Sequence, residues 1–162
     1  MRYFWYILCV IWSVVGCSTT KHHEQQSPQE DISDVRIILQ RTPCFGTCPI
    51  YTVTVTGRGD VQFIGTQYVY KEGEARKQIS VDSVRTLIRM FKDIQFSNLN
   101  DEYEDRAMSD APSAIVTYAT KDRSKTVKHY LGDMSAPEQL KKLEQAIDRI
   151  AKVHEWVNPP KE

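Results

Sequence analysis

The sequence predicts an α+β fold, a two-layer sandwich in which one antiparallel sheet carries two helices on one face. Three observations lead to this fold class. Short segments alternate apolar and polar residues and are joined by tight turns, as antiparallel strands are. Two later segments place apolar residues three and four positions apart, which is typical of helices with one apolar side. Such helices must bury that side, and the apolar face of the sheet is the available partner.

The first strands follow a polar N-terminal region. Strands are expected at 35–40, 51–56, 61–64, 68–70 and 77–79. In the second of these, Thr52, Thr54 and Thr56 point to one face while apolar residues point to the other. The turn residues 57–60 (GRGD) join it to the third strand as a hairpin, and a further pair is expected around 72–74.

The first helix is expected to start after Ser80, which can cap its N-terminus, with Asp82 in the first turn. It should end before Asn98. Its apolar stripe consists of Val81, Val84, Leu87, Ile88, Phe91 and Ile94. The helical spacing of these residues indicates that one side faces the sheet.

A second hairpin and a second helix complete the domain. The hairpin joins 114–120 to 125–131, and residues 135–138 (SAPE) predict a capping box that opens the helix. The stripe of this helix consists of Leu140, Leu143, Ile147 and Ile150. Trp156 and Val157 are expected to pack back onto the domain.

Composition limits the function. The chain has 162 residues, 41% hydrophobic and 26% charged, which suits one globular domain. Lysine plus arginine and aspartate plus glutamate both number 21, so the formal net charge is zero and no nucleic-acid partner is expected. The sequence has no P-loop, dinucleotide-binding glycine motif or G-x-S-x-G. We therefore assign no catalytic residue, no metal and no cofactor.

The first sixteen residues have the layout of a secretory signal peptide. Arg2 precedes an apolar stretch that ends in small residues. Residues 14–17 (VVGC) resemble the lipobox of bacterial lipoproteins. The resemblance implies cleavage between Gly16 and Cys17 and acylation of the Cys17 sulfur, and Ser18 after the cysteine favours the outer membrane. Two or more acyl chains anchor a protein stably to a membrane. The segment therefore implies that the membrane is a partner of this protein.

The mature chain is then expected to contain a tether and a domain. Residues 17–33 are the lipidated cysteine and a polar tether with a span of about 20–24 Å. Residues 34–158 form the domain and 159–162 a short tail. His22 and His23 lie in the tether, where a solvated pair is favoured over a metal site.

The segment 41–51 (RTPCFGTCPIY) is the most distinctive part of the domain, and three interpretations of Cys44 and Cys48 compete. Export to an oxidising compartment favours a disulfide. Redox catalysis is weaker, because three residues separate the cysteines and Pro49 leads into a strand instead of a helix. Metal binding would need two more ligands, and His129 and His154 have no ligand-like spacing.

The same segment resembles an uncharacterised bacterial family, a domain of unknown function found in exported proteins and lipoproteins. The motif C-F-G-T-C-P carries the resemblance, together with 96–103 (FSNLNDEY) and 144–152 (EQAIDRIAK). The likeness covers about residues 35–157. It implies a domain boundary and no particular activity.

Two hypotheses for the function follow. The first is an envelope lipoprotein whose domain binds or supports another envelope component, a protein or a glycan. The second is a thiol-redox enzyme that uses Cys44 and Cys48. Other charged groups are expected to be solvated: the acidic residues 101–105, and Lys121, Arg123 and Lys125 at a hairpin tip.

Overall fold

The computed structural model describes residues 30–104 and 110–159. The described residues from Asp31 onward belong to one compact unit. Its strands are β1 (Arg36–Arg41), β2 (Ile50–Thr56), β3 (Asp60–Gln67), β4 (Gly73–Gln78), β5 (Glu102–Tyr103), β6 (Ser113–Ala119) and β7 (Ser124–Tyr130). Its helices are α1 (Val81–Asp93), α2 (Glu138–Ile150) and α3 (His154–Val157), with a 3₁₀ turn η1 (Phe96–Asn98).

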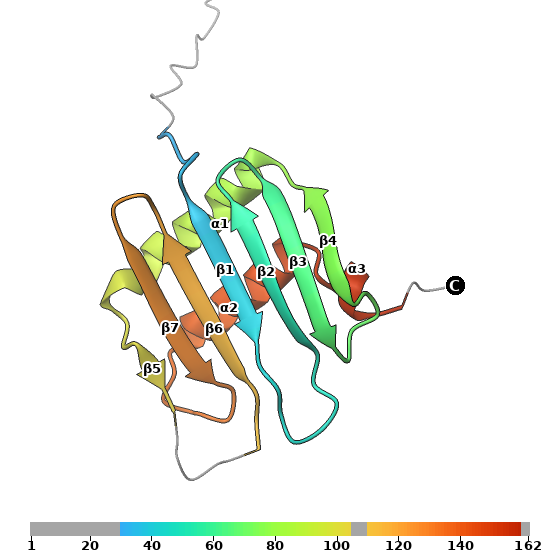
Figure 1. The fold of residues 1–162 in the computed structure, drawn as a ribbon. Coiled ribbons are helices and arrows are strands. Elements are labelled where there is room, and N and C mark those ends of the chain that lie inside the picture. Colours follow the sequence, from blue (N-terminus) through green and yellow to red (C-terminus); the bar gives the residue numbers. More distant parts are fainter. Residues whose placement is uncertain (1–29, 105–109, 160–162) are drawn as a thin grey trace, which may run out of the picture. The chain divides into compact units, whose positions relative to one another are not determined.

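The seven strands form one sheet in the order β4-β3-β2-β1-β6-β7-β5. All neighbouring pairs are antiparallel except β5 and β7, which run parallel. The first strand of the chain lies inside the sheet, between β2 and β6. Helices α1 and α2 cover the far face of the sheet in Figure 1. The predicted α+β sandwich is therefore confirmed.

Alternation along the strands separates the two faces. Ile37 and Leu39 of β1, Val53 and Val55 of β2, and Phe63 of β3 are fully buried on the helix side. The apolar stripes of α1 and α2 pack against them, with Val84, Leu87, Leu140, Leu143 and Ile147 at 0% exposure. Trp156 of α3 stacks on Phe63 with ring centroids 5.0 Å apart, so the predicted packing of the C-terminal residues is confirmed.

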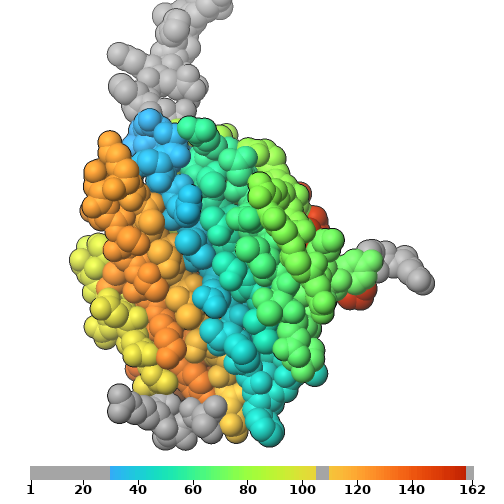
Figure 2. Space-filling view, in the orientation of Figure 1, coloured from blue at the N-terminus to red at the C-terminus, as the bar shows by residue number. Residues whose placement is uncertain are grey.

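The other face of the sheet carries no helix in the described part of the chain (Figures 1 and 2). Thr52, Thr54 and Thr56 alternate there with the buried residues of β2, as their spacing predicts. The hydroxyls of Thr117 and Thr126 lie 2.8 Å apart across β6 and β7. This face is the polar face of an antiparallel sheet with one side in water.

Two local predictions are wrong, and one short strand is not predicted. Residues 68–70 form a turn instead of a strand, and Tyr68 adopts a left-handed φ of 56°. The capping box does not form: α2 begins after Pro137, without a side-chain cap, and the backbone N–H of Ser135 donates to Asp133. Strand β5 was not expected, because two residues in an acidic segment have no strand pattern of their own.

The two ends of the sheet carry different loops. At one end the chain enters the domain beside the β2–β3 turn, where the Gly57 N–H donates to the Val35 carbonyl. A Cβ on Gly57 would lie 1.6 Å from the Ile32 carbonyl oxygen, so only glycine fits. Strand β1 then runs to the opposite end and leads into the loop with Cys44 and Cys48 (Figure 1). Within the described residues, no helix is both long and apolar enough to span a bilayer.

Candidate functional site

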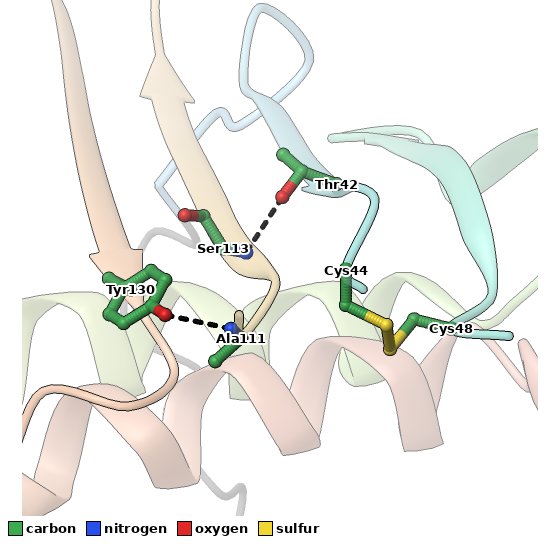
Figure 3. Close-up of a disulfide and its surroundings, with 6 residues drawn as sticks. All are labelled: Thr42, Cys44, Cys48, Ala111, Ser113 and Tyr130. Carbon is green, nitrogen blue, oxygen red and sulfur yellow. Dashed lines mark hydrogen bonds between the residues drawn. A yellow bond between two sulfur atoms is a disulfide. The ribbon is translucent and has the colours of Figure 1, made fainter. Parts of the chain in front are cut away.

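A disulfide closes the loop between β1 and β2. The sulfurs of Cys44 and Cys48 are bonded, with their Cα atoms 5.8 Å apart (Figure 3). The disulfide expected from the sequence is therefore present. Phe45, inside the closed loop, is 91% exposed. The cross-link thus holds an aromatic side chain in solvent at one end of the sheet.

Hydrogen bonds connect the disulfide loop to the segment before β6. The Thr42 N–H donates to the Ser113 carbonyl, and the Ser113 N–H donates to the Thr42 hydroxyl at 2.7 Å (Figure 3). The Ala111 N–H donates to the Tyr130 hydroxyl at 2.7 Å, which extends the connection to the end of β7. These contacts fix three connecting segments at the same end of the sheet.

A cluster of charged and polar side chains lies beneath this end, between the sheet and α2. The Arg41 guanidinium lies 2.7 Å from the Asp148 carboxylate and 3.6 Å from that of Glu144. The Tyr51 hydroxyl donates to Asp148 at 2.8 Å. His129 Nδ1 lies 2.8 Å from Glu144 Oε1. His129 and Glu144 are 1% and 2% exposed, so the fold buries an ionisable pair in its interior.

This cluster lines a groove of about 460 Å³. Its polar side consists of Arg41 and His129 from the sheet and Lys141, Glu144, Gln145 and Asp148 from α2. Its remaining walls are Cys48, Pro49, Tyr51, Pro112, Leu131 and Val157. Apolar walls with a few converging polar groups are the usual anatomy of a ligand-binding site, and the volume lies within the ordinary range.

The electrostatics of the cluster hold Arg41 and Tyr51 in their protonated forms. Burial alone would lower the pKa of Arg41, but the nearby Asp148 carboxylate outweighs it and raises the pKa above its ordinary value. Burial raises the pKa of Tyr51, and the negative charge of Asp148 raises it further. Arg41 and Tyr51 therefore act as hydrogen-bond donors to the acidic side chains of α2.

His129 has one nitrogen in use and one without a partner. His129 Nδ1 forms a hydrogen bond with Glu144 Oε1, and the Glu144 carboxylate also lies 3.6 Å from the Arg41 guanidinium. The Nε2 atom is buried and has no hydrogen-bond partner among the described residues.

One other histidine, His154, lies within the described residues. His154 is exposed at the start of α3 and lines a second, neighbouring groove with Tyr51 and Asp148 of the cluster. In residues 30–104 and 110–159, no group of three or more cysteine, histidine or acidic side chains could hold a metal ion. His22, His23, Gly16 and Cys17 lie outside the described residues.

Two lysines of β7 form ion pairs with the acidic residues that follow η1. Lys125 pairs with Asp101 and also donates to the Leu99 carbonyl at 2.7 Å. Lys128 pairs with Glu102 at 2.7 Å and Glu104 at 3.5 Å. The acidic residues 101–104 are thus partly neutralised by lysines of β7 and do not form a separate site.

Sequence reasoning did not assemble the buried cluster. The sequence patterns relate His129 only to a possible metal site, and Glu144 and Asp148 only to a family resemblance. Two signals were present. His129 shares the strand phase of Val127, which faces the core, and Glu144 follows Leu140 by four residues on the apolar side of its helix. A charge in the core phase of an element indicates a buried partner.

Together the fold and the site define a disulfide-closed α+β sandwich domain with a polar groove between its sheet and one helix. The chain belongs to the family described as Domain of unknown function (DUF6438), whose model matches residues 35–151. The matched range contains the disulfide and all five residues of the buried cluster. A comparison with curated proteins finds no match.

Proposed function

We propose that this protein is a lipoprotein of the bacterial cell envelope whose domain binds another envelope component through the groove. In this proposal residues 1–16 are a signal peptide, and cleavage after Gly16 exposes Cys17 for acylation. Residues 17–33 tether the domain, 34–158, to the outer membrane. The motivation is the lipobox-like sequence at 14–17 and the disulfide, which suits an oxidising compartment.

The groove is the observation that carries the binding role. It combines apolar walls, a buried charged cluster and a histidine nitrogen without a partner in the described structure. Burying Arg41, Glu144 and His129 together requires their charges and hydrogen bonds to be matched closely. Apolar residues in the same place would stabilise the fold at least as well as these charges do. We therefore interpret the charged cluster as a recognition site.

The position of the groove also suits a partner away from the membrane. The chain enters the domain at one end of β1 (Figure 1), and Arg41, which lines the groove, is the last residue of this strand. Six residues of extended strand separate them by about 20 Å. A tether that ends at Ser33 therefore joins the domain at the end of β1 opposite the groove.

A thiol-redox activity is the alternative, because Cys48 lines the same groove. Two features favour a structural disulfide instead. Cys48 leads through Pro49 into β2, so it lacks the helix N-terminus that lowers a thiol pKa. Arg41, the cation next to the loop, is already paired with Asp148. A disulfide that resists glutathione buffers supports this assignment, and a labile one supports catalysis.

Site-specific photo-crosslinking in intact cells tests the binding role. Benzoylphenylalanine replaces Phe45, an exposed residue of the disulfide loop that also contains Cys48 of the groove wall, or Val81, an exposed apolar residue at the start of α1. We expect a covalent adduct with an envelope protein or glycan from position 45 and none from position 81. The proposal is wrong if position 45 gives no adduct, or if both positions give the same adducts.

A further inference from the structure

The binding groove continues along α2 into the second groove, which has a volume of about 370 Å³. The two grooves share four lining residues: Tyr51, Gln145, Asp148 and Val157. They therefore form one continuous surface, which we call the joined groove. Lys141 lines its first part and Arg149 its second. Eight residues of helix separate these two by about 12 Å, so the joined groove suits an elongated ligand.

The acidic side chains of the joined groove are already bonded inside the protein. The Asp148 carboxylate accepts hydrogen bonds from Arg41 at 2.7 Å and from the Tyr51 hydroxyl at 2.8 Å. Glu144 is 2% exposed, and its carboxylate lies 2.8 Å from His129 Nδ1 and 3.6 Å from Arg41. A ligand in the groove therefore meets carboxylates whose charge is offset by their neighbours.

The basic side chains of α2 have no such partners. Lys141 is half-buried and Arg149 is exposed, and neither forms an ion pair or a side-chain hydrogen bond within the described parts of the chain. The Ser135 N–H chiefly, and Lys141 at longer range, lower the pKa of Asp133, which forms no ion pair with Lys141. With Arg41, three positive and two negative side chains line the joined groove, histidines aside. The surplus attracts an anionic ligand.

The polar residues of α2 are spaced for an extended peptide. Lys141, Gln145 and Arg149 follow one another at intervals of four residues, so they lie along one side of the helix. An extended peptide rises about 3.3 Å per residue, so its first and fifth residues lie about 13 Å apart and point the same way. Acidic side chains at these two positions can reach Lys141 and Arg149 together, with the middle residue beside the Gln145 amide.

The wall contributed by the other elements is aliphatic. It consists of Pro49, Pro112, Leu131 and Val157. The second and fourth residues of an extended peptide point away from α2, so apolar side chains at these positions can pack on this wall. The wall offers no exposed aromatic ring to the flat face of a sugar, because Tyr51, the one aromatic residue among the described lining residues, is 6% exposed. An acidic peptide therefore fits better than an acidic saccharide.

We propose that the joined groove binds an extended segment of another protein in which two acidic residues stand four positions apart, with apolar residues at the second and fourth positions. Lys141 and Arg149 pair with the two acidic side chains. Basic side chains beside apolar pockets are a recurring means of recognising acidic peptides. This inference rests on the proposed binding role and gives its partner a chemistry.

Fluorescence anisotropy of the full chain in a neutral detergent tests this inference. The probe is a fluorescein-labelled peptide, Gly-Glu-Val-Ser-Val-Glu-Gly. Three unlabelled competitors are compared with the unlabelled probe peptide: the same peptide with glutamine for both glutamates, the rearranged peptide Gly-Glu-Glu-Val-Ser-Val-Gly, and trigalacturonate as an acidic saccharide. We expect saturable binding of the probe and the strongest competition from the unlabelled probe peptide.

Two adjacent lysines of α2 provide a matched pair of variants. Lys141→Gln removes a charge that lines the joined groove, whereas Lys142→Gln removes an exposed charge that lines neither of its parts. We expect Lys141→Gln and Arg149→Gln each to weaken binding of the probe about threefold, as the loss of one exposed ion pair does. Lys142→Gln should leave the binding unchanged.

Three results overturn the inference. They are equal competition by the neutral or the rearranged peptide, stronger competition by trigalacturonate, and equal effects of Lys141→Gln and Lys142→Gln. Absence of probe binding also overturns it. If position 45 still gives an adduct in cells in that case, the binding role stands and the acidic peptide is excluded as its ligand.

Discussion

At the scale of single residues, the disulfide has a stabilising effect that can be measured. The bond between Cys44 and Cys48 closes a short loop, and chain entropy gives about 2 kcal/mol for a loop of this size. The double variant Cys44→Ser, Cys48→Ser should lose about this free energy of unfolding, measured by urea denaturation. Reduction of the unmodified protein should give the same loss. An unchanged midpoint under oxidising conditions would show that the bond does not stabilise the fold.

The raised pKa of Tyr51 predicts a loss of stability in alkaline solution. Burial and Asp148 raise the pKa of Tyr51 above its ordinary value of 10.0. Above about pH 10 the unfolded chain releases this proton while the folded protein retains it, so the free energy of unfolding falls as pH rises. Tyr51→Phe, which cannot titrate, should show a shallower fall between pH 9 and 11. Tyr70→Phe, an exposed position, is the control. Equal slopes in all three proteins would contradict the prediction.

The residues of the site could be predicted from the sequence only in part. Cys44 and Cys48 are close in sequence, so their pairing needs little knowledge of the fold. His129 lies on a strand and Glu144 on a helix, fifteen residues apart in the sequence. Arg41 lies on the first strand, far from both in the sequence. Their meeting depends on which strand lies over which part of α2. The local pattern shows that His129 and Glu144 each lie on the buried side of their element, but it does not show which residue each contacts.

At the scale of elements, two serines were expected to cap helices and only one does so. The Ser80 hydroxyl accepts a hydrogen bond from the Ser83 N–H at 3.1 Å, whereas α2 has no side-chain cap. Ser80→Ala should therefore lower the free energy of unfolding by about 1 kcal/mol. Ser135→Ala, the matched control, should change it little. Both can be measured by urea denaturation, and equal losses in the two variants would refute the assignment of the caps.

The elements themselves were mostly predictable, because alternation and helical spacing are local properties. The hairpins β2–β3 and β6–β7 and both long helices lie close to where the patterns place them. The turn after β3 was misplaced, since Tyr68, Val69 and Tyr70 resemble a strand in composition. They turn because the Tyr70 and Lys71 N–H groups donate to the carbonyls of Val157 and Trp156. A distant segment thus overrides the local preference.

At the scale of the whole molecule, the order of the strands decides where the site lies. Strand β1 pairs with both β2 and β6, which are far apart in the sequence. This pairing brings the disulfide loop, the start of β6 and the end of β7 to one end of the sheet. Hairpins can be predicted from neighbouring residues, but the partner of an isolated first strand cannot. The groove is a consequence of that pairing, so it could not be located from the sequence.

The proposed anchoring in the cell envelope involves the entire chain, from the signal peptide to the domain. A lipid-anchored protein loses residues 1–16, gains acyl groups on Cys17 and matures where Cys44 and Cys48 can oxidise. These three properties are separate chemical changes, and one spectrum can report all of them. Cys17→Ala is the matched control, because it removes the acylated sulfur and leaves the domain sequence intact.

The most direct test is the intact mass of the protein from its native host, after free thiols are alkylated without reduction. We expect a chain that begins at Cys17, with the added mass of acyl groups and with Cys44 and Cys48 unalkylated. The Cys17→Ala variant should carry no acyl mass. A chain that still begins at Met1, with an unacylated Cys17 and alkylated Cys44 and Cys48, would contradict the proposed export, anchoring and oxidation together.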